Sequence, residues 1–299
     1  MIHLRLFTES LLYIQPLDSY KNVLHRLFAF MKHTKTKASN NFFNFREKIK
    51  LTLLTITLLL YSFIPFYFQQ NENVKEIIKK ADEKMRGKTS MAEITIQVVR
   101  PSWSREIKLK MWSKGNTYSI ILLTAPAKEK GIVFLKRDKE VWNWIPSIER
   151  VIKMPPSMMS QSWMGTDFTN DDLVKESSIV DDYEHFMVGD TTILGRDCHK
   201  IKLIPKPEAA VVWGKIILWI DKKDYIQLKA ELYDEEEELI STMQSSEIKM
   251  LGGRLLPSRT EMIPRDKKNQ KTIMLFNQLR FDELIEDNFF SPDNMKKIY

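Results

Sequence analysis

The chain has 299 residues, of which 43% are hydrophobic and 28% charged, with 9 Gly, 12 Pro and a single Cys. This composition excludes a disulfide scaffold, a collagen-like chain and a wholly disordered protein. The net charge of +7 is concentrated in residues 1–50, which hold nine basic and three acidic side chains. Since the part from Gln69 onward is nearly neutral, the sequence does not favour nucleic-acid binding.

A charge-free apolar segment follows the basic leader. It begins at Leu51 and ends at Phe68. Its length suits either a membrane-spanning helix or a long signal peptide, and the positive-inside rule places residues 1–50 in the cytoplasm. We therefore expect the rest of the chain to be exported to the periplasm or cell envelope, with the segment either cleaved or kept as an anchor. Met31 is a second possible start, which would leave residues 1–30 untranslated.

The exported part begins with a helical pattern and continues with strand patterns. Apolar residues recur at helical spacing between residues 74 and 85, and Gly87 follows as a C-terminal stop. The period then changes to two, first at Ile94 and Ile96, and alternating runs separated by turn signals continue to Phe281. They make about a dozen strands, among them residues 215–220, 226–233, 239–245 and 247–251, and we expect none between residues 146 and 198. Such a succession predicts a mainly β domain with one large curved antiparallel sheet or barrel.

Residues 154–178 interrupt the alternation. The segment is rich in methionine, contains Trp163, and includes a polar stretch at residues 166–172 that could cap a short helix. We interpret it as a lid or insertion between strands.

Enzymatic alternatives have weaker support in the sequence. Five carboxylates could form a metal or acid/base cluster, but they lie in turn-like stretches where we expect helix capping and solvation. His185 and His199, even with the lone Cys198, lack zinc-ligand spacing, and no nucleophile-elbow or phosphate-loop motif occurs. We therefore predict no enzyme activity, no cofactor and no metal. The five carboxylates are Asp167, Asp171, Asp172, Asp181 and Asp182.

Several stretches, in this order and spacing, resemble the LolA/LolB-like outer-membrane lipoprotein-sorting proteins. The likeness runs from about Asn73 to Phe290. It implies an incomplete antiparallel β-barrel, formed by a lipid-binding domain over residues 69–299, whose open side is covered by helices around an apolar cavity for acyl chains. The helix at residues 74–85 and the insertion would supply that cover. The matching stretches are residues 125–146, 163–173, 193–207 and 219–221.

One position departs from the family pattern. In the carrier members of the family an Arg-Pro pair at the end of an early strand hydrogen-bonds to the lid. This chain contains Arg100-Pro101, but measured back from Ala125-Pro126 the pair falls one strand too early. The matching place lies near Lys114-Gly115, so we do not assign the lid contact to Arg100.

The resemblance and the residues together predict a non-covalent acyl-chain carrier for lipid or lipoprotein in the cell envelope. Burial of an acyl chain is favourable by roughly 0.8 kcal/mol per methylene, and methionines suit a cavity that opens and refills. The alternative is a structural or adaptor module that docks an envelope transporter without transferring a ligand. Large apolar side chains are the candidate lining of the cavity: Trp112, Phe134, Trp142, Trp144, Met154, Met158, Met159, Trp163, Met164, Trp213 and Trp219.

Overall fold

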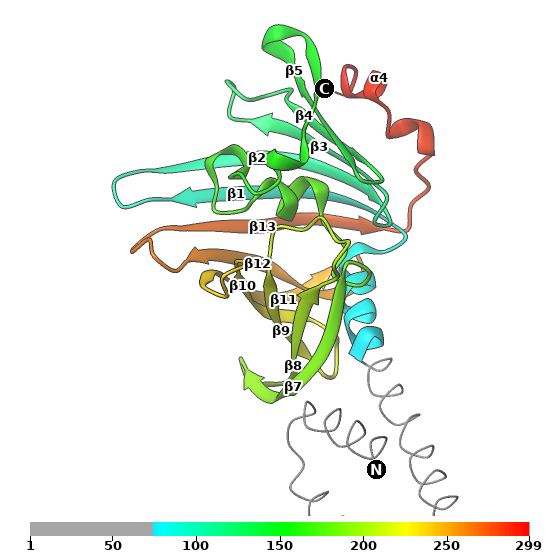
Figure 1. Cartoon of the computed structure of the whole chain (residues 1–299). Helices are drawn as coiled ribbons and strands as arrows, with labels where there is room; N and C mark the ends of the chain where they lie inside the picture. The colour runs from blue at the N-terminus through cyan, green and yellow to red at the C-terminus, as the bar shows by residue number, and fades with distance from the viewer. Residues whose placement is uncertain (1–73, 299) are drawn as a thin grey trace, which may run out of the picture. The chain divides into compact units, whose positions relative to one another are not determined.

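The computed structural model describes residues 74–298, which belong to the second of two compact units, Tyr67–Tyr299. The predicted helix is present at residues 74–86. Ile78 is fully buried on its inner side, and Gly87 ends it with a left-handed backbone (φ 67°) and a hydrogen bond from its N–H to Glu83 O at 2.8 Å. We call this element the N-terminal helix; it is drawn in cyan in Figure 1.

Within residues 74–298, thirteen strands form one antiparallel sheet, which confirms the predicted mainly β, open-sheet fold. The strand order is β6-β5-β4-β3-β2-β1-β13-β12-β11-β10-β9-β8-β7, so β6 and β7 are the two edges. Alternating burial, as in β10, shows why these residues form strands with one face in the core. The bounds of the first six are β1 Thr89–Val99, β2 Ser104–Lys114, β3 Tyr118–Ala125, β4 Val133–Arg137, β5 Glu140–Ile145 and β6 Arg150–Lys153.

The second half of the chain returns from the far edge to the centre of the sheet. Its last strand pairs with β1 along ten residues of each strand, from Ser90↔Phe281 to Val99↔Lys271, with one bulge after Glu93. Among the described residues, this is the one strand ladder that joins the two halves of the sheet. The bounds are β7 Tyr183–Ile193, β8 Arg196–Pro205, β9 Lys215–Asp221, β10 Gln227–Tyr233, β11 Leu239–Leu251, β12 Arg254–Pro264 and β13 Lys271–Phe281.

The strand order forces the chain to pass from one edge of the sheet to the other between β6 and β7. Residues 154–182, which we call the crossing segment, make this connection (Figure 1). The predicted insertion therefore exists, but it contains short turns rather than an α-helix. The turns are η3 Pro156–Met158, η4 Trp163–Gly165 and the π-helical η5 Asp171–Lys175.

The apolar side chains lie on both faces of the sheet. The largest core cluster lies on the inner face, below the N-terminal helix and the crossing segment, and includes Ile96, Leu218 and Trp163. A second cluster, the outer cluster, is formed by β3–β5 together with residues of the C-terminal segment such as Phe290 and Met295. That segment holds η6 Asp287–Phe289 and α4 Pro292–Met295, drawn in red in Figure 1.

Candidate ligand cavity

A cavity of about 370 Å³ lies on the inner face of the sheet. Its floor is made by inward-facing residues of the central and second-half strands, and its cover by the N-terminal helix and the crossing segment. The sheet side chains that line it are mostly aliphatic and methionine: Ala92, Ile94, Ile96, Leu109, Met111, Ile121, Ile216, Leu218, Ala230, Leu232, Met243, Leu256, Met262, Met274, Phe276 and Leu279, and the floor also includes Ser90, Ser113, Ser245 and Thr260.

The crossing segment contributes aromatic cover and is fixed by local hydrogen bonds. Trp163 is fully buried, with its ring 5.8 Å from that of Phe134. Thr169 N–H donates to Asp172 Oδ2 at 2.7 Å, and Asp172 N–H donates back to Thr169 Oγ1 at 3.1 Å. Trp213 Nε1–H donates to Asp172 Oδ1 at 2.8 Å. The first two bonds fix the turn at residues 169–172, and the third ties Trp213 to that turn.

The end of β1 ties the crossing segment to the middle of the sheet. Arg100 donates two hydrogen bonds to Asp167, Nη1 to Oδ2 at 2.9 Å and Nη2 to Oδ1 at 3.1 Å, and a further bond to Gly165 O. Thr272 of β13 donates to Asp167 Oδ2 at 2.7 Å. The Asp167 side chain is 2% exposed. A charge-assisted bidentate pair in such a dry place is strong and geometrically specific.

The sequence comparison does not assign a lid contact to Arg100, whereas in the structure Arg100 contacts the crossing segment. Lys114 Nζ instead donates to Asp287 and to Ile285 O of the C-terminal segment. The reason lies in the alternation of the strand: Ser113 of β2 faces the cavity, so the next residue, Lys114, faces the outer side, where the C-terminal segment lies.

The predicted solvation of the carboxylates is also wrong for Asp167 and Asp171 of the crossing segment. Asp171 is buried, accepts a hydrogen bond from Ser177 Oγ at 2.8 Å and pairs with Lys175 at 3.2 Å. Burial raises the pKa of Asp172, although its bonds from Thr169 and Trp213 oppose the shift. Asp181, in contrast, is exposed. Within residues 74–298, no group of three or more potential metal-ligating side chains is found.

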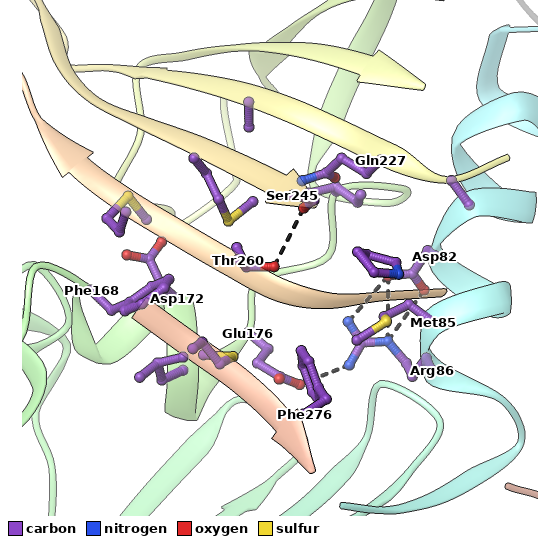
Figure 2. Close-up of a pocket in the computed structure, with 18 of the residues that line it drawn as sticks. Asp82, Met85, Arg86, Phe168, Asp172, Glu176, Gln227, Ser245, Thr260 and Phe276 are labelled. Carbon is purple, nitrogen blue, oxygen red and sulfur yellow. Dashed lines mark hydrogen bonds and ion pairs between the residues drawn. The ribbon is translucent and has the colours of Figure 1, made fainter. Parts of the chain in front are cut away.

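One end of the cavity is polar (Figure 2). Arg86 of the N-terminal helix donates from Nη1 to Glu176 Oε2 at 2.7 Å and from Nη2 to Asp82 Oδ1 at 3.1 Å. Burial opposes the charge on Arg86, but the two carboxylates outweigh it and raise its pKa above the usual value. Behind this trio, burial lowers the pKa of Lys136 to about 8, partly offset by Glu176. Lys136 Nζ donates to Glu176 O at 3.2 Å and to Asn116 Oδ1 at 3.1 Å.

Seven of the eleven predicted lining residues lie on the cavity side of the sheet. Trp163 and Trp213 line the cavity directly. The other five surround it in the same core cluster or pack against that cluster: Phe134, Met154, Met158, Met159 and Met164.

The remaining four predicted residues lie on the outer face, away from the cavity. Trp112, Trp142 and Trp144 belong to or pack against the outer cluster. Trp219 packs with Cys198 in a third cluster, between Lys200 and Lys229, whose Nζ atoms lie 5.2 Å and 4.4 Å from the ring centroid. Sequence reasoning missed most of the floor, because it selected large side chains rather than the inward positions of alternating strands.

The predicted leader and apolar segment at residues 1–68 lie outside the described residues. In the described part of the chain, no helix combines the length and apolar character needed to cross a membrane.

Comparison with known proteins supports the fold. A DUF1329 family protein from Desulfovibrio piger has a TM-score of 0.69 at 20% identity, over 76% of this chain and 99% of its own. A putative outer membrane lipoprotein-sorting protein domain from Vibrio parahaemolyticus has a TM-score of 0.68 at 22% identity, over 76% and 99%. A LolA superfamily protein from Nitrosomonas europaea has a TM-score of 0.64 at 22% identity, over 74% and 98%.

The family comparison covers more than half of the chain. No curated protein matches the chain. A family model described only as that of an uncharacterized protein matches residues 115–297. The chain therefore belongs to this family of uncharacterized proteins, and its fold is that of the LolA-like outer-membrane lipoprotein-sorting proteins.

Proposed function

We propose that this protein binds acyl chains of lipid or lipoprotein reversibly in its inner cavity and carries them within the cell envelope. The observation that carries the proposal is a mainly apolar cavity of about 370 Å³. Ligand sites of this kind span about 300–1,000 Å³, and burial of an acyl chain contributes roughly 0.8 kcal/mol per methylene. No covalent chemistry is needed.

The construction of the cover supports reversible binding. The floor belongs to a continuous sheet, whereas the cover is a separate crossing segment held by the Arg100–Asp167 pair and by turns. Such a segment can shift without breaking any strand ladder. The expected export through residues 51–68 would place the domain in the periplasm, where it could receive its ligand from an envelope transporter.

Lipid extraction and mass spectrometry of the purified full chain test the proposal. We expect co-purified acyl lipid, and saturable binding of a fluorescent apolar probe after delipidation. Ala230, 1% exposed on the cavity floor, gives the blocking variant Ala230→Trp, which should abolish probe binding. The exposed Gln244 on the adjacent strand gives the matched control Gln244→Trp, which should bind normally.

The outcome also separates a carrier from an adaptor. Circular dichroism must show that Ala230→Trp is folded, and Ala230→Leu provides a milder blocking variant if it is not. A delipidated wild-type chain that binds neither probe nor lipid, but crosslinks to one envelope protein with or without lipid, would contradict the carrier function.

A further inference from the structure

The two ends of the cavity differ in chemistry. Phe168 lies at one end with Asp172, whose oxygens are occupied by Trp213 and Thr169. Figure 2 shows Asp82, Arg86 and Gln227 gathered toward the other end. An amphiphile in this cavity would therefore place its polar group beside the N-terminal helix and Glu176.

The basic side chains that line the cavity are already committed to partners within the protein. Among the described lining residues these are Lys84 and Arg86. Lys84 Nζ donates to Asp224 O on the loop after β9, and Arg86 is shared between Asp82 and Glu176. An anionic headgroup would compete with two carboxylates for Arg86 and would approach their negative charge.

A hydrogen-bond acceptor remains available at the same place. Glu176 Oε2 accepts from Arg86, while no partner is found for Oε1 among the described residues. The Glu176 side chain is 20% exposed, at the rim of the cavity. The backbone of Glu176 is left-handed, with φ 46°. This conformation costs free energy in residues other than glycine or asparagine, and it persists where the surroundings impose it. Lys136 and Asp171 bond its carbonyl and N–H groups.

We infer that the ligand is an acyl chain whose polar end donates hydrogen bonds and carries no negative charge, such as a hydroxyl or amide head, and that Glu176 selects against fatty-acid carboxylates. The inference rests on the proposed function and specifies the ligand class of the same cavity. Glu176 and Asp82 would accept the hydrogen bonds of the head, while the acyl chain lies along Ile94, Ile96 and Met274.

Displacement of the fluorescent probe from the delipidated full chain at pH 8 tests this selectivity. We expect monododecanoyl glycerol to displace the probe about tenfold more effectively than dodecanoate, which corresponds to one repulsive contact at the head. In Glu176→Gln, loss of the negative charge and release of Arg86 should make displacement of the probe by dodecanoate several-fold more effective. The ratio between the two compounds should therefore become smaller. Asp82→Asn should act in the same direction from the opposite side of Arg86.

A matched control tests whether the effect is local. Glu231 pairs with Lys229 at 2.6 Å on the outer face and is as buried as Glu176, so Glu231→Gln should leave the ratio unchanged. Equal or better displacement by dodecanoate in the wild type would overturn this inference and leave the acyl-binding function standing. Failure of both compounds to displace the probe would overturn both this inference and the acyl-binding function.

Discussion

The inner and outer faces of the sheet are both rich in apolar side chains, but over β3–β5 the outer face is packed against the C-terminal segment, whereas a cavity remains on the inner face. On the outer face the C-terminal segment inserts Phe290 and Met295, both fully buried, against β3–β5. Tyr118 and Phe290 stack at 5.5 Å, and Phe289 meets Phe290 edge-on at 5.3 Å. On the inner face the cover supplies Trp163 and Phe168, yet also Arg86 and Glu176, and a cavity remains.

This difference indicates that the covering segment, and not the sheet, decides whether a face is packed or keeps a cavity. Both sides of β3 carry aliphatic residues, Ile120 outward and Ile121 inward. What differs is the volume and polarity of the side chains laid over them. Three experiments challenge or refine this interpretation.

The largest effect on stability is expected from truncation of a buried aromatic side chain in the outer cluster. Phe290→Ala should lower the free energy of unfolding by about 3–5 kcal/mol, because it removes a fully buried ring and leaves a void. Denaturant unfolding measures the change. Probe affinity under native conditions should stay at the wild-type value, and a parallel loss of affinity would show that the two faces are not independent.

The next effect depends on pH and concerns the charge buried beside the cavity. The pKa of Lys136 is about 8 in the folded protein, below the ordinary lysine value of 10.5 that applies in the unfolded chain. Since the unfolded chain binds more protons between these values, the stability of the wild type should rise with pH across this window relative to Lys136→Met. The difference in unfolding free energy between the two proteins should change by up to about 3 kcal/mol.

Denaturant unfolding of both proteins from pH 7 to pH 10 makes this measurement, and shifts in other groups cancel in the difference. A constant difference over that range would mean that Lys136 is solvated.

The smallest effect is the difference between a matched pair of isoleucines, Ile120 on the outer face and Ile96 on the cavity floor, each 0% exposed. Ile120→Ala should cost about 2–5 kcal/mol. Ile96→Ala should cost about 1 kcal/mol less, because that side chain already borders empty space and loses fewer contacts. Equal losses in denaturant unfolding would indicate that the floor is as tightly packed as the outer cluster.

The interior strands can be predicted from sequence, but the edges cannot. A continuous apolar run places β9, and alternating apolar residues place β10, each almost to the residue. The edge strands β6 and β7 are missed. Most side chains of Arg150–Lys153 are exposed, and β7 is exposed over much of its length, so no apolar periodicity marks them. A further pair of expected strands, residues 239–245 and 247–251, forms the single strand β11.

The apolar character of the cavity can be predicted from the sequence, but only some of its lining residues can. Trp163 and Trp213 are identified because they are large and aromatic. Trp112 and Trp144 have the same residue type and lie on strands, so nothing in their local pattern distinguishes the outer face from the inner one. The Arg86–Glu176 pair joins residues 90 positions apart, and only the fold brings them together.

The route of the chain has one more consequence. Among the described residues, β1–β6 and β7–β13 meet through the β1–β13 ladder, and the C-terminal segment of the second half packs on the outer face of the first. Lys84 of the N-terminal helix also bonds to Asp224 of the second half, so several contacts hold the halves together besides the covalent link. Protease nicking inside residues 154–182 should therefore yield two fragments that co-elute under native conditions, and co-expression of the fragments should reconstitute the sheet.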